Sequence, residues 1–98
     1  MSYQKGRNFE NYIKDKLERK GYFVVRSAAS KGVYDLIAIK NGVVYGIQCK
    51  AGKARASKQE KERMVEFGER YGIVPVLATK RSKRVVFVDV RSNVDLDL

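Results

Sequence analysis

Three polar residues near the middle of the chain, Asp35, Gln48 and Lys50, are of types that together can hydrolyse a phosphodiester. Side chains of Asp and Gln offer oxygen atoms, the donors that Mg²⁺ prefers, and the main-chain carbonyl of Cys49 could add another. A bound cation lowers the pKa of water and neutralises phosphate charge, while an ammonium positions the nucleophile and stabilises the developing charge. The pattern therefore predicts a hydrolase that uses Mg²⁺, with Mn²⁺ as a substitute.

A β-hairpin would bring these residues together. Residues 34–40 and 43–50 are both strand-like, and Asn41-Gly42 between them is a strong hairpin signal. Asp35 lies six positions before this turn and Gln48 six positions after it, so antiparallel pairing would bring the two close together. Because side chains alternate across a strand, Gln48 and Lys50 would share one face of the sheet.

Each of these residues also has an ordinary structural interpretation. Asp35 alone could be a residue of a turn or a strand start, and Lys50 alone could be a solvated strand end. Glu10 could equally be a surface residue of the first helix. The chemical interpretation rests on Asp35, Gln48 and Lys50 meeting around one hairpin.

Two helices are predicted to flank the strands. From residue 6 to about residue 20, apolar residues recur at helical spacing and form one face; they are Phe9, Tyr12, Ile13 and Leu17. A capping box at Ser57 to Glu60 starts the second helix, and Tyr71-Gly72 ends it. We expect Met64 and Phe67 of this helix to lie in the core.

Further strands are predicted at residues 22–26, 73–78 and 85–90, which gives the order α-β-β-β-α-β-β. The second helix is a crossover long enough to make the strands on either side of it parallel. The prediction is a single α/β domain over residues 1–98, a mixed β-sheet flanked by helices. Residues 91–98 are expected to be a loosely ordered tail.

Composition restricts the partners and the chemistry. The 98 residues carry a formal charge of +10, which favours a polyanion such as nucleic acid. The chain has no histidine and one cysteine, so histidine-based zinc sites, histidine-assisted nucleophiles and internal disulfides are excluded. No apolar run approaches the ~20 residues that cross a bilayer, and the sequence predicts an intracellular (cytoplasmic) protein without a membrane partner.

Four segments, in order, carry a resemblance to a known family. Val33-Tyr34-Asp35 with Gly46-Ile47-Gln48-Cys49-Lys50 resembles the bipartite PD-(D/E)XK nuclease signature. Lys5-Gly6-Arg7-Asn8-Phe9-Glu10 and Arg26-Ser27-Ala28-Ala29-Ser30 resemble segments of the archaeal Hjc Holliday-junction resolvases. The resemblance covers roughly the first two-thirds of the chain and implies the PD-(D/E)XK nuclease-like fold.

The resemblance also implies roles for individual residues. Glu10 would complete a metal site with Asp35, Gln48 and the carbonyl of Cys49, Lys50 would be the catalytic lysine, and Ser30 would approach the scissile strand. The family's phosphate contacts would fall on Arg26 and Lys31, with Lys5 and Arg7 as further candidates. A basic run that directly follows the catalytic strand lies where a phosphate backbone would run; it comprises Lys53, Arg55 and Lys58.

Two positions depart from the family pattern. Tyr34 replaces a proline that mainly shapes the strand entry, and Gln48 replaces an acidic metal ligand. By resemblance the chain would be a homodimeric endodeoxyribonuclease that cuts branched DNA at four-way junctions, with an interface on the second helix and the last strands. Two alternatives stay open: an Mrr-like or restriction-type DNA nuclease, for which glutamine is usual, and a junction-binding module that has lost catalysis at Gln48.

Overall fold

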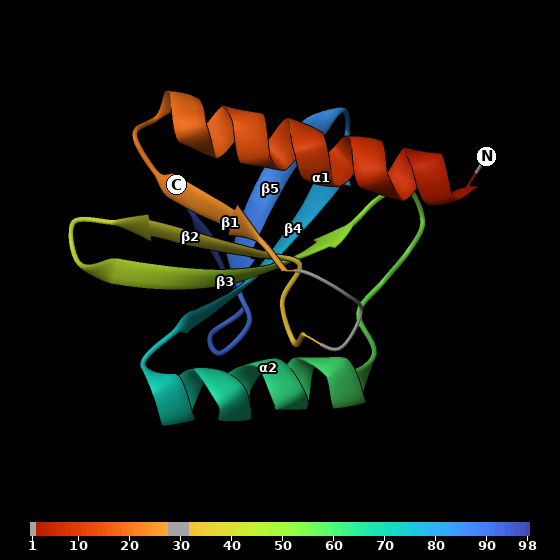
Figure 1. Ribbon diagram of the computed structural model, residues 1–98. Coiled ribbons are helices and arrows are strands. Elements are labelled where there is room, and N and C mark those ends of the chain that lie inside the picture. The colour runs from red at the N-terminus through yellow and green to blue at the C-terminus, as the bar shows by residue number, and fades with distance from the viewer. Residues whose placement is uncertain (1, 28–31) are drawn as a thin grey trace.

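The computed structural model describes residues 2–27 and 32–98, with side chains from residue 8 onward in those ranges. Two helices and six strands follow one another along the chain (Figure 1): α1 (Ser2–Arg19), β1 (Phe23–Arg26), β2 (Leu36–Lys40), β3 (Val43–Lys50), α2 (Lys58–Tyr71), β4 (Val74–Arg81), β5 (Arg84–Asp89) and β6 (Val94–Leu96). No helix in the described part of the chain is long and apolar enough to cross a membrane.

The six strands form one mixed sheet in which the spatial order equals the sequence order. Neighbouring strands pair antiparallel except β3 and β4, which are parallel. Helix α2 makes the crossover between these two strands, as a parallel pair requires. The two helices lie on opposite sides of the sheet (Figure 1). The predicted α/β architecture with a mixed sheet is confirmed.

Helix α1 supplies one side of the core. Phe9, Ile13 and Leu17 are buried at spacings of four residues and pack against strand residues such as Leu36 and Ile47. Tyr12, which was expected on the same face, is 52% exposed. The helix also begins at Ser2 instead of residue 6. Glycine at position 6 is tolerated inside this helix, so its presence did not mark a boundary.

Helix α2 begins and ends where the sequence predicts. Ser57 is its N-cap in a complete capping box with Glu60, and Gly72 closes it in the left-handed conformation, with φ 69°. Met64 is fully buried, but the prediction that Phe67 lies in the core is wrong, because this side chain is 39% exposed. The face of α2 that the sheet buries is therefore narrower than the apolar face that the sequence predicts.

The expectation of a loosely ordered tail is wrong for most of residues 91–98. Strand β6 pairs antiparallel with β5, and Leu98 is 8% exposed in the core cluster. Asp89 holds the turn that leads into β6. Its carboxylate accepts hydrogen bonds from the main-chain nitrogen of Arg91 (2.9 Å) and from the Arg91 guanidinium (2.8 and 3.0 Å).

These contacts predict a pH-dependent contribution to stability. The hydrogen bonds from Arg91 hold the pKa of Asp89 below its usual value. A carboxylate with a lowered folded-state pKa stabilises the fold above its unfolded pKa of about 3.9, and this contribution is lost as the pH falls further. Asp89→Asn should therefore cost about 1–2 kcal/mol at pH 7, and the cost should shrink below about pH 4.

Urea unfolding of wild type and Asp89→Asn between pH 7 and pH 2 measures this difference. The exposed Asp15 is the matched control, and Asp15→Asn should track the wild type throughout. A constant gap between wild type and Asp89→Asn at all pH values would contradict the assignment.

Candidate active site

The β2–β3 hairpin places Asp35 beside Gln48 and Lys50. Leu36 pairs with Ile47, and one residue earlier the main-chain nitrogen of Asp35 donates to the carbonyl oxygen of Ile47 at 2.8 Å. The Asp35 carboxylate then accepts a hydrogen bond from the main-chain nitrogen of Cys49 at 2.8 Å. Asp35 thus faces the segment between Gln48 and Lys50, as antiparallel pairing around Asn41-Gly42 predicts.

Glu10 of α1 lies beside Arg26, the last residue of β1. Its carboxylate lies 3.9 Å from Nε of Arg26 on β1, and Arg26 also donates to the side-chain oxygen of Asn11. Burial raises the pKa of the Cys49 thiol, and the negative charges of Asp35 and then Glu10 raise it further. The charges of both carboxylates therefore influence Cys49, although the two residues come from different elements.

Lys50 has a partner that the sequence did not reveal. Its ammonium lies 3.1 Å from Oε2 of Glu60, and the Lys50 side chain is 18% exposed. Oε1 of Glu60 accepts from the main-chain nitrogen of Ser57 at 2.8 Å. These two interactions, the capping contact first, lower the pKa of Glu60. The sequence predicts the capping box, but the contact between Glu60 and Lys50 depends on the path of residues 51–57.

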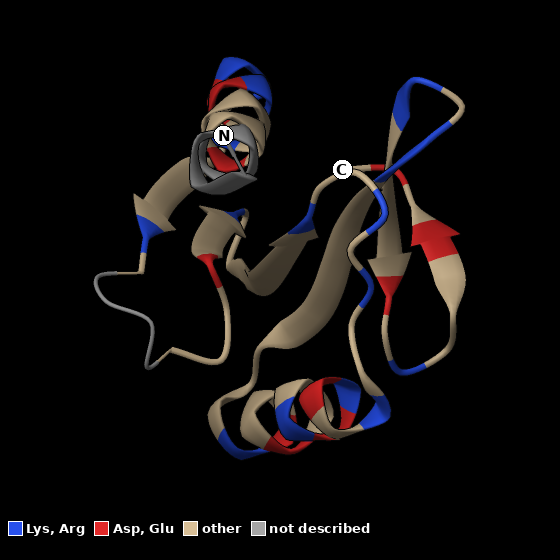
Figure 2. Ribbon diagram, turned by 90° about the vertical axis from the view of Figure 1, so that its right-hand side faces the viewer, with Lys and Arg blue, Asp and Glu red and all other residues tan. Residues whose placement is uncertain are grey.

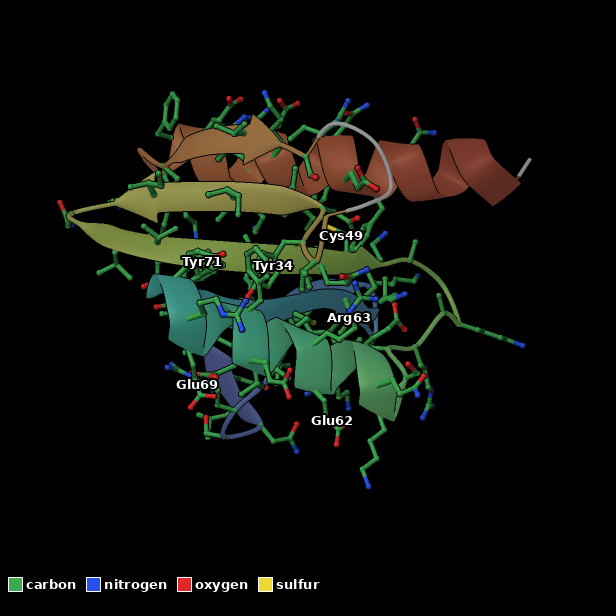
Figure 3. All side chains as sticks on the ribbon, turned by 60° about the horizontal axis from the view of Figure 1, so that its bottom comes forward. Tyr34, Cys49, Glu62, Arg63, Glu69 and Tyr71 are labelled. Atoms are coloured by element: carbon green, nitrogen blue, oxygen red, sulfur yellow. The ribbon has the colours of Figure 1, made fainter. Side chains whose placement is uncertain are left out.

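Tyr34 does more than shape the entry to β2. The side chain is 4% exposed, and its hydroxyl donates to the carbonyl oxygen of Met64 at 2.7 Å. Figure 3 shows Tyr34 between β3 and α2, where its ring covers Gly46; a Cβ at position 46 would lie 2.5 Å from that ring. Burial raises the pKa of the phenol. Tyr34 thus joins α2 to the sheet immediately before Asp35.

The loss of this hydroxyl should weaken the attachment of α2. Tyr34→Phe removes one buried hydrogen bond, so we expect the free energy of unfolding to fall by about 1 kcal/mol. Denaturant titration measures the loss, with Tyr12→Phe as the control because Tyr12 is exposed. Equal stability of Tyr34→Phe and wild type would show that the hydroxyl contributes nothing.

The remaining residues singled out in the sequence divide into two groups. Ser30 and Lys31 lie outside the described residues, and Lys5 and Arg7 belong to α1 but their side chains are outside the described part. Lys53 and Arg55 are exposed and line a groove together with Lys50. Lys58 is the first residue of α2, is exposed, and does not line this groove.

The donor set fits a hard divalent cation. Asp35 and Glu10 offer carboxylates, Gln48 an amide oxygen and Cys49 a carbonyl, which are the oxygen ligands that Mg²⁺ and Mn²⁺ accept. Hard cations prefer oxygen to sulfur, so Cys49 would contribute its carbonyl oxygen and not its thiol. Among the described residues no three His, Cys, Asp or Glu side chains are grouped closely enough to hold a metal. An oxygen-ligand site here would therefore need donors besides carboxylates, such as the Gln48 amide and the Cys49 carbonyl.

Comparison with solved structures identifies the fold. The structure of Hjc from Archaeoglobus fulgidus, a Holliday junction resolvase, superposes with a TM-score of 0.77 at 23% identity and covers 88% of this chain and 78% of its own. At this identity the likeness concerns the fold. This fold agrees with the nuclease-like fold that the resemblance of the hairpin motif implied.

Sequence comparison extends the likeness to the family. The crossover junction endodeoxyribonuclease Hjc of Methanocaldococcus jannaschii is 40% identical over 89% of this chain, and that of Sulfurisphaera tokodaii is 33% identical over 86%. The chain spans about two-thirds of the length of these relatives, 67% and 65%. The family model described as archaeal Holliday junction resolvase (Hjc) matches residues 1–95, and the chain belongs to this family.

Proposed function

We propose that this chain is an endodeoxyribonuclease that resolves four-way DNA junctions by metal-dependent hydrolysis of phosphodiesters. The observation that carries the proposal is the hydrogen bond that the Asp35 carboxylate accepts from the main-chain nitrogen of Cys49. Cys49 is the residue between Gln48 and Lys50, so this bond holds Asp35 next to both. Membership of the Hjc family and the formal charge of +10 support it. The proposal includes an intracellular location, because DNA junctions arise where DNA is recombined.

Each residue of the site has a separate task in this proposal. Asp35, Glu10, the Gln48 amide and the Cys49 carbonyl would hold the divalent cation, Mg²⁺ with Mn²⁺ as a substitute. When bound, the cation supplies an activated water and neutralises phosphate charge. The Lys50 ammonium stabilises the charge that develops on the phosphate, and Glu60, 3.1 Å away, keeps that ammonium in place. Arg26 offers a guanidinium at the same edge for a neighbouring phosphate.

Restoring the acidic ligand should strengthen the metal site. A carboxylate binds Mg²⁺ more tightly than a neutral amide does. We expect Gln48→Glu to lower the Mg²⁺ concentration for half-maximal cleavage by about tenfold, roughly 1.4 kcal/mol of added affinity. Cleavage rates across a Mg²⁺ titration measure it, with Gln48→Ala as the variant that should need more metal. An unchanged requirement in Gln48→Glu would remove Gln48 from the ligand set.

A homodimer is part of the proposal, because symmetric cuts in a four-way junction need two identical sites at fixed spacing. The exposed rings of Phe67 and Tyr71 lie 4.7 Å apart on α2 and offer an apolar contact surface. The molar mass from light scattering tests the dimer, with Phe67→Lys as the variant expected to separate the subunits. A monomeric wild type would contradict this part of the proposal.

Substrate competition distinguishes the proposal from its alternatives. A labelled junction is incubated with protein and Mg²⁺ in the presence of excess unlabelled junction or excess unlabelled linear duplex of the same sequence. Inhibition by junction alone is expected of a resolvase. Equal inhibition by duplex would favour a general nuclease of the Mrr-like or restriction type, and binding without cleavage in Mg²⁺ or Mn²⁺ would favour a junction-binding module.

A further inference from the structure

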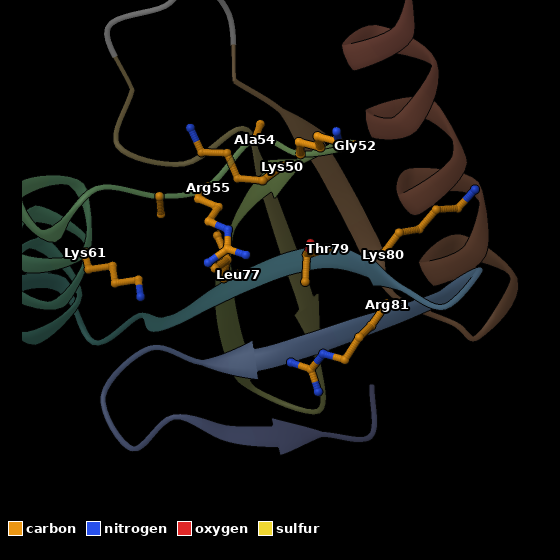
Figure 4. A pocket seen from close by; sticks show the side chains of 11 residues that line it. Lys50, Gly52, Ala54, Arg55, Lys61, Leu77, Thr79, Lys80 and Arg81 are labelled. Carbon is orange, nitrogen blue, oxygen red and sulfur yellow. The ribbon is translucent and has the colours of Figure 1, made fainter.

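A basic groove lies beside the candidate active site and extends away from it across β4. It has a volume of about 860 Å³, and six of its eleven lining residues are Lys or Arg. None of these lining residues is Asp or Glu. Figure 4 shows Lys50 near one end of the groove and Arg81 at the other, with Arg55 and Lys61 on a side wall.

The parallel pairing of β3 with β4 builds the floor of the groove. Lys50 pairs with Thr79, so the side chain of Thr79 lies on the same face as the candidate catalytic lysine. Arg81 follows on this face two residues later, whereas Lys80 points away from the other labelled cations (Figure 4). The floor thus carries positive charge from the active site towards the end of β4.

The segment before α2 and the first turns of that helix form the wall. Arg55 comes from the connection between β3 and α2, and Lys61 from the beginning of α2. Lys and Arg recur along this connection and on the β4–β5 hairpin (Figure 2). Cations from β3, the β3–α2 connection, α2 and β4 therefore line one depression, which is a stronger observation than a run of basic residues in the sequence.

Two of the groove's cations have acidic partners at its edge. Lys50 is paired with Glu60, and Arg81 lies 3.6 Å from Asp95 of β6. The side chains of Arg81 and Asp95 are each 61% exposed, so solvent screens this pair strongly. A phosphate can therefore replace Asp95 as the partner of Arg81 at little cost.

We propose that this groove binds the sugar-phosphate backbone of the DNA strand that continues from the cleaved phosphate. The inference rests on the proposed function and extends it from the reacting phosphate to the path of the strand. The groove begins at Lys50 on β3, and its other cations lie on the β3–α2 connection, on α2 and at the end of β4. On its floor, the Thr79 hydroxyl can donate to a phosphate oxygen. Several cations spread along one groove suit a polymer of phosphates better than a single small anion.

The test compares two double variants with equal loss of charge. Lys61→Ala/Arg81→Ala removes two groove cations, and Arg19→Ala/Lys20→Ala removes two exposed cations at the end of α1. Fluorescence anisotropy gives the junction Kd from 50 to 300 mM NaCl in Ca²⁺, and circular dichroism checks that the proteins are folded. The groove variant should bind about tenfold or more weakly at ~0.1 M salt, with a salt slope reduced by about 1 to 2.

A third variant has the opposite expected effect. Asp95→Asn removes the acidic partner of Arg81, so it should tighten binding by about twofold or more and leave the salt slope at least as steep. The Arg19→Ala/Lys20→Ala control should match wild type in both Kd and cleavage rate. A salt slope of the groove variant equal to that of the control would overturn the proposal, as would a failure of wild type to bind DNA.

Cleavage by the wild type distinguishes this inference from the proposed function. If wild type cuts the junction but the groove variant keeps the slope of the control, only the groove assignment is wrong. If wild type binds the junction without cutting it, and the groove variant shows a smaller salt slope of the Kd, the groove assignment is supported and the nuclease proposal is wrong.

Discussion

Replacing Asp35 by asparagine should reduce the rate of junction cleavage by about 10³-fold or more while junction binding persists. In the proposed metal site the Asp35 carboxylate is a ligand of the cation. Stabilisation by a bound cation amounts to several kcal/mol, and each ~1.4 kcal/mol corresponds to a tenfold change in rate. The asparagine oxygen can still accept the hydrogen bond from the main-chain nitrogen of Cys49, so the hairpin should be retained. Single-turnover cleavage and anisotropy measure the two quantities.

Asp15→Asn is the matched control for this experiment, since Asp15 is an exposed carboxylate on α1. It should cleave at the wild-type rate. Cleavage by Asp35→Asn within about tenfold of wild type would exclude Asp35 as a metal ligand. Loss of both binding and thermal stability would instead assign Asp35 a structural role.

Replacing Lys50 by methionine should lower the cleavage rate by about 10²-fold to 10³-fold, the range found when one group that stabilises transition-state charge is removed. Methionine preserves the length and apolar contacts of the half-buried stem. The Kd for the junction should rise only a few-fold, because Lys50 is one cation among six at the groove. Single-turnover rates at saturating protein isolate the chemical step.

Two further variants serve as controls for Lys50→Met. Lys16→Met removes a lysine of α1 and should leave the rate unchanged. Glu60→Gln keeps an oxygen for the capping contact with Ser57 but removes the charge facing Lys50, so its rate should fall less than that of Lys50→Met. A full rate in Lys50→Met would exclude Lys50 from the chemistry.

Local signals sufficed to predict the hairpin and the second helix. Asn41 and Gly42 have φ of 53° and 78°, the two positive values that a type I′ turn requires, and this turn fixes the pairing of β2 with β3. From that register alone, Asp35 was expected beside Gln48. The Ser57 capping box and the left-handed Gly72 likewise act within a few residues of the positions they mark.

The features that the sequence did not predict depend on distant contacts. Phe67 has helical spacing with Met64, yet the sheet covers only part of that face. Strand β6 is the exception, because its pairing with β5 and the bonds between Asp89 and Arg91 are local; its three residues are too few to show the alternation of a strand. The contact of Lys50 with Glu60 has no sequence signature, because it depends on a turn of the chain between β3 and α2. The role of Glu10 likewise came from family resemblance and not from periodicity.

Cleavage of a four-way junction by the wild-type protein in Mg²⁺ tests the central claim most directly. Each strand is labelled in turn, and the linear duplex arms are incubated in parallel at the same protein concentration. The account predicts paired cuts at symmetric positions on opposing strands of the junction, and intact duplex arms. No cuts at saturating protein in either Mg²⁺ or Mn²⁺, or cuts of equal yield in the duplex, would contradict it.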